Sequence, residues 1–99
     1  MHPQTQEKPE SYDHYFLSYS GTKLPLKLVN SLELSEVENR NTYFGANVDE
    51  QGRTTLIHRV VYGEIDLEHR YGYHESGALA WAEILDSEGE VRRLTFAAE

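Results

Sequence analysis

The sequence predicts a small, mainly β protein: a twisted antiparallel meander of about six or seven strands built from consecutive hairpins. Three observations predict this fold. From residue 12 onward, apolar residues recur mostly at every second position, which is the period of a strand with one buried side. Glycine-bearing turns separate these short runs. The length of 99 residues, of which 38% are hydrophobic, suits one domain with a modest core.

The chain divides into a disordered N-terminal tail at residues 1–11 and a single β-meander domain at residues 12–99. The tail has two prolines and no branched aliphatic or aromatic side chain, so it cannot bury enough surface to offset the entropy of ordering. The first expected strand covers residues 12–20. The second covers residues 24–29, where Pro25 cannot donate to a ladder and so indicates an edge strand or a bulge.

The segment from residue 30 to residue 41 does not alternate, and it is the one place where a helix is expected. At most one short helix near residues 32–40 fits the pattern, with Ser35 and Glu38 as a capping box. Strand character then returns for the rest of the chain. The five further strands are expected at residues 42–49, 54–62, 64–74, 78–86 and 90–97.

Three of the reversals between these strands share a polar first residue and a glycine in fourth position. They are Asp49–Gly52, His74–Gly77 and Asp86–Gly89. This pattern is typical of a type I turn followed by a residue with positive φ, which glycine adopts without steric cost. The reversal at Tyr62-Gly63 is shorter, and it predicts either a two-residue hairpin or a bulge within one long bent strand.

Two resemblances follow from the residues themselves. The unit Tyr73–Leu79, YHESGAL, resembles the Tyr-x-x-x-Gly-x-Leu unit of MORN-type repeats and of YwqK-type antitoxin repeats. That likeness implies a single-layer sheet of hairpins used as an interaction surface. The segments YFLSYSG, LPLKLV and NRNTYF, which begin at residues 15, 24 and 39, are similar to a bacterial family of unknown function and of similar length. This second likeness implies no activity, cofactor or catalytic residue.

Composition excludes several classes of function. The net charge of −8 opposes binding to nucleic acids and to anionic membrane surfaces. The absence of cysteine excludes disulfides, thiolate nucleophiles, zinc ribbons and iron–sulfur clusters. No nucleophile elbow or phosphate-binding glycine loop is present, so neither an enzyme nor a cofactor is expected. The N-terminus lacks the apolar stretch of a secretory signal, which favours a cytoplasmic protein.

The first functional hypothesis is a noncatalytic protein-interaction domain, such as an accessory, immunity or antitoxin-like subunit, that binds a protein partner or forms a homodimer. A sheet of one layer cannot cover both of its faces, and Tyr and Trp provide large contact areas at low entropy cost. Alternatively, these aromatic rings fill the core of a sheet that has few aliphatic residues. The candidate partner-binding residues are Tyr62, Tyr71, Tyr73, Trp81 and Arg40.

The second hypothesis is a protein that binds a small molecule or a metal through strand histidines. The weak metal-ligand candidates are His58, His69 and His74. Positions 69 and 74 differ by an odd number, so in a regular strand they face opposite sides, and only a bulge at Gly72 could bring them together.

The acidic run Glu64, Asp66 and Glu68 occupies every second position, which places the three carboxylates on one side of a strand. Such a face is typically solvated and paired with arginines on neighbouring strands. The third hypothesis is that this acidic face mimics a nucleic acid and is captured by a basic partner.

Overall fold

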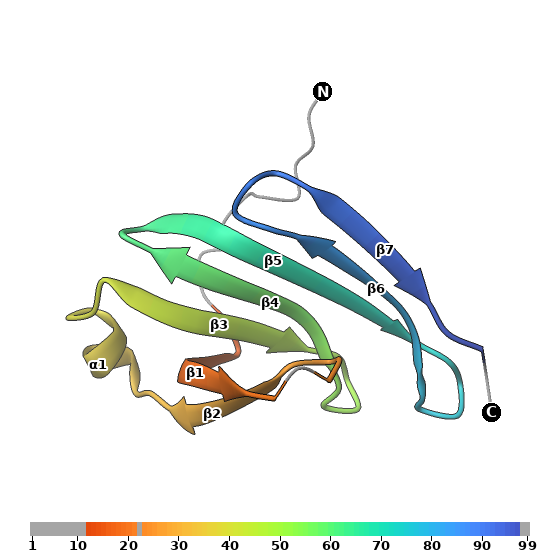
Figure 1. Ribbon diagram of the computed structural model, residues 1–99. Helices are drawn as coiled ribbons and strands as arrows, with labels where there is room; N and C mark the ends of the chain where they lie inside the picture. The colour runs from red at the N-terminus through yellow and green to blue at the C-terminus, as the bar shows by residue number, and fades with distance from the viewer. Residues whose placement is uncertain (1–11, 22, 98–99) are drawn as a thin grey trace.

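The computed structural model describes residues 12–21 and 23–97, which form one open, seven-stranded antiparallel sheet (Figure 1). This confirms the predicted mainly β fold, whereas the tail predicted at residues 1–11 lies outside the described residues. Across the sheet the strand order is β2-β1-β3-β4-β5-β6-β7, so β3 lies beside β1 and the simple meander begins only there. The elements are β1 His14–Ser20, β2 Lys27–Ser31, α1 Leu34–Val37, β3 Thr42–Val48, β4 Thr54–Val61, β5 Glu64–Tyr73, β6 Leu79–Leu85 and β7 Val91–Thr95.

The three glycine-bearing reversals form the hairpins that the sequence predicts. In the turn from β3 to β4, the Gly52 N–H donates to the Asp49 carbonyl oxygen over 2.9 Å, and the Asp49 N–H donates to the Arg53 carbonyl oxygen. The other two turns repeat this pair of bonds. Each fourth-position glycine has a positive φ, between 83° and 96°. A Cβ at these positions would strain the backbone, which is why the sequence places glycine there.

The reversal between β4 and β5 is the two-residue hairpin, not a bulge within one long strand. Both central residues have positive φ, 50° for Tyr62 and 81° for Gly63, as a type I′ turn requires. A bulge follows, because Arg59 pairs with Leu67 while Val60 pairs with Ile65. The extra residue interrupts the alternation, so the predicted common side for Glu64, Asp66 and Glu68 is wrong.

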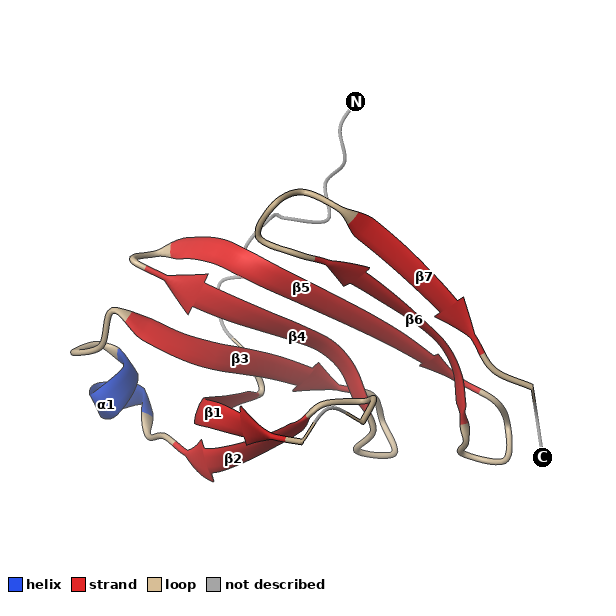
Figure 2. Cartoon of the chain, in the orientation of Figure 1, coloured by secondary structure: helices blue, strands red, loops and turns tan. Residues whose placement is uncertain are grey.

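The first third of the chain departs most from the expected boundaries. Pro25 lies in the loop before β2, since it cannot donate a ladder hydrogen bond, and β2 begins only at Lys27. The helix is the single turn α1, between β2 and β3 (Figure 2). Its capping box is not Ser35 with Glu38: the Glu33 N–H donates to Glu36 Oε1 over 2.8 Å.

One face of the sheet holds the apolar core and is called the core face. Its buried cluster consists of Phe44, Ala46, Ile57, Tyr71 and Ala82. Leucines from the loop between β1 and β2 pack against this cluster and cover part of the face. The opposite side, which carries the buried side chains of His58 on β4 and Glu68 on β5, is called the network face. The loop between β1 and β2 therefore covers part of the apolar side of the sheet.

Candidate ligand-binding site

The strand register places the two central histidines on opposite faces of the sheet. His58 pairs with Glu68 across β4 and β5, and both side chains point to the network face. His69 pairs with Ile57, which belongs to the core. Because neighbouring positions on a strand alternate in direction, residues 68 and 69 must point apart. Each histidine therefore has a separate environment.

On the network face, four side chains form a closed polar network. The His58 Nδ1 atom lies 2.8 Å from the Tyr12 hydroxyl, and its Nε2 atom lies 2.7 Å from Glu68 Oε1. The Arg70 Nε–H donates to Glu68 Oε2 over 2.8 Å. The Tyr12 ring packs directly over Gly45, where a Cβ would come closer than 3.0 Å to the ring. Both ring nitrogens of His58 are thus satisfied.

The protonation states fit a structural network and not a reactive one. Burial alone would raise the pKa of Glu68, but hydrogen bonds from His58 and Arg70 outweigh it and lower that pKa below its usual value. Burial raises the pKa of the Tyr12 hydroxyl well above its usual value, with neighbouring acidic groups adding to the effect. Tyr12 therefore remains a neutral hydroxyl and is not an activated nucleophile.

On the core face, a second tyrosine holds the second histidine. The Tyr71 hydroxyl oxygen accepts the Leu26 N–H over 3.1 Å and lies 2.6 Å from His69 Nδ1. The Tyr71 hydroxyl proton has no other acceptor among the described residues, so we assign the hydroxyl as the donor to Nδ1. A neutral imidazole that accepts at Nδ1 carries its proton at Nε2.

Burial keeps this histidine neutral. It lowers the pKa of His69 to about 4 and raises the pKa of Tyr71 to about 12. His69 is only 5% exposed, and its Nε2 atom has no hydrogen-bond partner within residues 12–21 and 23–97. The core face therefore presents an N–H donor that the described protein does not use.

This histidine lines a hollow of about 280 Å³ between the loop from β1 to β2 and strands β4 to β7. We call it the His69 hollow. Its apolar lining includes Leu24 and Leu26 from the loop and Leu67, Ile84 and Leu94 from the sheet. Arg59 and Arg92 add two guanidinium groups to the lining. A mostly apolar wall with a few polar groups is typical of small-molecule sites.

The two arginines of the hollow differ in their partners. Arg59 forms an ion pair with Asp66, and its Nε–H donates to the carboxylate over 2.8 Å. Arg92 is exposed and has no ion-pair partner in the described part of the chain. The bulge in β5 supplies Asp66 to the first arginine, so Arg92 remains the available cation of the hollow.

The four candidate aromatic residues do not form one surface. Tyr71 is 3% exposed in the core, whereas Tyr62 is 75% exposed at the tip of the hairpin between β4 and β5. Trp81 pairs with Gly72 and therefore points to the network face, opposite Tyr71. There it stacks on the Arg93 guanidinium, 4.9 Å from the ring centroid. A binding role for any of them remains a prediction.

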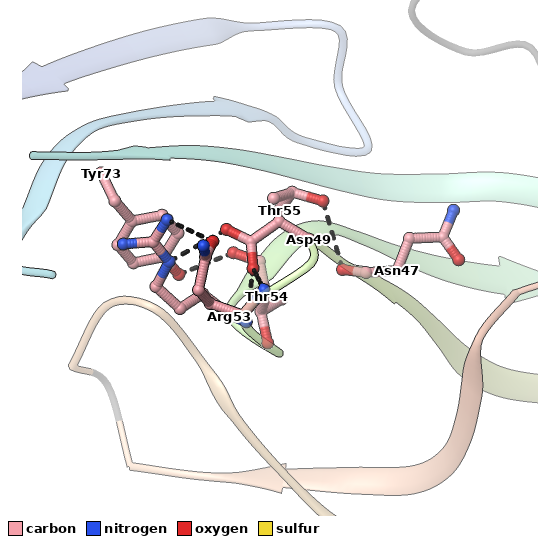
Figure 3. Close-up of polar contacts among 7 residues, drawn as sticks. Asn47, Asp49, Arg53, Thr54, Thr55 and Tyr73 are labelled. Carbon is pink, nitrogen blue, oxygen red and sulfur yellow. Dashed lines mark hydrogen bonds and ion pairs between the residues drawn. The ribbon is translucent and has the colours of Figure 1, made fainter. Parts of the chain in front are cut away.

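Tyr73, the last residue of β5, lies against the end of the hairpin between β3 and β4, as Figure 3 shows. Its hydroxyl donates to the Thr54 carbonyl oxygen over 2.6 Å, and the Arg53 guanidinium lies 5.0 Å from its ring centroid. Arg53 in turn forms a 2.9 Å ion pair with Asp49. The backbone N–H of Arg53 is the main cause that lowers the pKa of Asp49. These contacts close the hairpin.

The remaining two candidates also bond to the backbone. Arg40 is exposed, and its Nε–H donates to the Thr42 carbonyl oxygen over 3.3 Å. His74 starts a turn, where its Nε2 atom lies 2.8 Å from the Phe96 carbonyl oxygen. The three candidate histidines therefore lie in three separate places. No group of three metal-binding side chains occurs within the described ranges.

Sequence reasoning missed Arg92 and the leucines of the loop as site residues. The alternation of β7 contains the signal for Arg92, because it shares a side with Leu94 two positions later. The leucines at positions 24 and 26 fit a strand pattern, and Pro25 between them predicted an edge strand or a bulge, whereas the structure has a loop there. That this loop crosses the core face could not be read from local pattern.

Comparison with known proteins identifies the family to which the chain belongs. Within the described residues, no helix has the length and hydropathy needed to cross a bilayer. No curated protein and no solved structure matches the chain. The model of one family of unknown function, DUF6156, matches residues 8–99, which is nearly the whole sequence. The chain therefore belongs to DUF6156, a family of unknown function.

Proposed function

We propose that the protein is a noncatalytic binding protein for a small, largely apolar molecule held in the His69 hollow. The observation that carries this proposal is that His69 lines the hollow while its buried Nε2–H has no partner among the described residues. Leaving a buried donor unsatisfied costs about 1–3 kcal/mol. An acceptor on a bound molecule would remove that cost.

The lining and the size of the hollow support the same function. Leucines from the loop and from the sheet meet there, so an apolar ligand would remove surface from water on both sides. The volume of about 280 Å³ is near the lower end for ligand pockets, which favours a small molecule. No nucleophile or activated base is needed for such binding.

The test is an NMR titration of ¹⁵N-labelled protein with 1-octanol as an uncharged apolar probe. We expect saturable shift changes in the amides of the hollow, such as those of Leu67 and Ile84. Leu94→Trp fills the hollow and abolishes these changes. Val91→Trp, on the opposite face of the same strand, is the matched control and retains them. Absence of saturable changes, or equal changes in Leu94→Trp, would overturn the proposal.

The second candidate is the protein-interaction domain, favoured by the open edge of β7. Among the described elements, this strand pairs only with β6. Its outer backbone groups are therefore free to pair with another chain. Val91 is 65% exposed and Phe96 is 39% exposed along this edge. Homodimers, or an accessory, immunity or antitoxin-like role in the manner of the hairpin repeats that the chain resembles, would use such an edge.

Sedimentation over about a hundredfold range of concentration tests self-association through this edge. A dimer that dissociates in Val91→Lys, but not in Tyr62→Lys at the tip of the hairpin between β4 and β5, supports the second candidate. A strictly monomeric protein whose β7 amides also exchange freely with solvent contradicts pairing with itself.

A further inference from the structure

We propose that the His69 hollow selects a monocarboxylate with an apolar chain, whose two carboxylate oxygens are bound by the Nε2–H of His69 and by the Arg92 guanidinium. This inference rests on the proposed function and names the class of its ligand. It depends on the placement of the two donors, on their charge and on the shape of the hollow between them.

The two donors stand in one row across the sheet. His69 on β5 pairs with Ile84 on β6, and Ile84 pairs with Arg92 on β7. Residues paired in this way share a face, and adjacent strands are about 4.8 Å apart, so the two Cα atoms are about 10 Å apart across Ile84. A long arginine side chain folded over Ile84 would approach the imidazole. An acceptor lying on Ile84 then meets one donor on each side.

The charges of the side chains that line the hollow favour a ligand with a single negative charge. Tyr71 fixes the imidazole as a neutral N–H donor, so His69 contributes a hydrogen bond and no charge. Arg59 is already neutralised by Asp66. Arg92 is therefore the one cation of the lining that lacks an ion-pair partner among the described residues. A carboxylate matches one guanidinium and one neutral donor, because charged hydrogen bonds of this kind are the strong ones.

A more highly charged ligand fits the surroundings less well. The protein carries a net charge of −8, so it repels anions except where a local cation acts. A phosphate dianion would leave one charge without a cation in a partly apolar hollow, which is costly. An uncharged ligand would leave the guanidinium unused.

The apolar end of the ligand has a separate place in the hollow. Leu94 lies two positions from Arg92 on the same side of β7, and the leucines of the loop face it. A volume of about 280 Å³ corresponds to roughly nine waters at about 30 Å³ each. Octanoate, a small carboxylate with one unbranched apolar chain, is a suitable probe of this size.

The test compares octanoate with 1-octanol on the same protein by NMR titration at pH 7. We expect octanoate to bind about tenfold more tightly than 1-octanol, as one charge-assisted interaction provides. Arg92→Gln should remove this preference, because the glutamine amide carries no charge. Arg92→Lys, which keeps the charge, should restore part of it.

Arg93→Gln is the matched control, because it removes the same charge one residue away on the network face. It should leave the preference for octanoate unchanged. Equal binding of octanoate and 1-octanol would overturn the carboxylate inference and leave the proposed function intact. Equal losses in Arg92→Gln and Arg93→Gln would also overturn it, since the preference would then reflect overall charge. Failure of both probes to bind would overturn the proposed function itself.

Discussion

Each face of this sheet buries a histidine that contacts a tyrosine hydroxyl, but the second ring nitrogen of the histidine is bonded on one face and not on the other among the described residues. On the network face, His58 lies between Tyr12 and Glu68, and both of its nitrogens are bonded. On the core face, His69 is bonded at Nδ1 by Tyr71, and its Nε2 has no partner in the described part of the chain beside a hollow that His69 lines. A closed network can only stabilise the fold, whereas an open one has a donor left for a ligand.

The two tyrosines also anchor different parts of the chain. Tyr12 lies just before β1, and its ring packs over Gly45 and holds this segment against the sheet. Tyr71 holds the loop between β1 and β2, because its hydroxyl accepts the Leu26 N–H. Both anchors act on the N-terminal third, which contributes the least regular part of the sheet. Long-range polar contacts therefore replace the tight hairpins that organise β3 to β7. Substitutions on the two faces should separate stability from binding.

The largest effect is expected when the closed network is broken at its centre. His58→Leu removes the partner of Glu68 Oε1 and of the Tyr12 hydroxyl at a fully buried position. We expect a loss of about 3–5 kcal/mol in the free energy of unfolding, measured by urea denaturation. The binding of 1-octanol on the other face should persist in the folded fraction.

The matched variant removes both partners. In His58→Leu combined with Glu68→Met, no carboxylate remains buried without its histidine, so more than half of the lost stability should return. If the double variant is as unstable as His58→Leu plus the full cost of Glu68→Met alone, the two side chains do not act as a pair.

The next effect concerns pH, and it arises mainly on the core face. The pKa of His69 is lowered to about 4 in the folded protein, against an ordinary value of 6.5, so the unfolded chain binds the proton more readily in this interval. The resulting stability is complete above pH 6.5 and is lost as the pH falls toward 4, by up to about 3 kcal/mol. Glu68, whose pKa is lowered, adds a further loss below its ordinary value of 4.5.

His69→Phe tests this assignment, because phenylalanine cannot take up a proton. The slope of the unfolding free energy between pH 6.5 and pH 4 should flatten in this variant, while the loss at lower pH remains. An unchanged slope between these values would assign the acid sensitivity to other groups.

A smaller effect compares two glycines of the network face, each beneath an aromatic ring. A Cβ at Gly45 would clash with the buried Tyr12 ring, and a Cβ at Gly72 would clash with Trp81. Tyr12 is tied to His58 and cannot move without breaking the network, whereas Trp81 is half-buried and can shift toward solvent. We expect Gly45→Ala to cost about 2 kcal/mol and Gly72→Ala about half as much. Equal costs in urea denaturation would contradict the difference between the two rings.

The part of the fold that could be predicted from sequence is the part built by local chemistry. The glycines at positions 52, 77 and 89 need positive φ for a reason that is contained in four residues, so the hairpins that they close were predictable. The bulge at Asp66 was not, because it depends on the register that the Tyr62-Gly63 turn imposes on both strands. That bulge places Glu68 on the network face, opposite to Glu64.

The candidate site was predictable only in its residue types. The sequence marks His69 as a histidine in a strand. Its proposed role depends on Tyr71, on the course of the loop between β1 and β2, and on β7, which lies two strands away from β5 in the sheet. These are contacts between residues far apart in sequence, and no local period encodes them. The same limit explains why Tyr12 looked like the start of a strand, although its ring packs across the sheet on Gly45.

The smallest effect separates the two tyrosines directly. Tyr12→Phe and Tyr71→Phe each remove one hydroxyl, and each should cost about 1 kcal/mol in urea denaturation. Their effects on binding should differ. Without the Tyr71 hydroxyl, the His69 proton is no longer fixed at Nε2 and Leu26 loses its anchor, so the preference for octanoate over 1-octanol should fall severalfold. Tyr12→Phe leaves that preference unchanged, and an equal fall in both variants would show that the two faces are coupled.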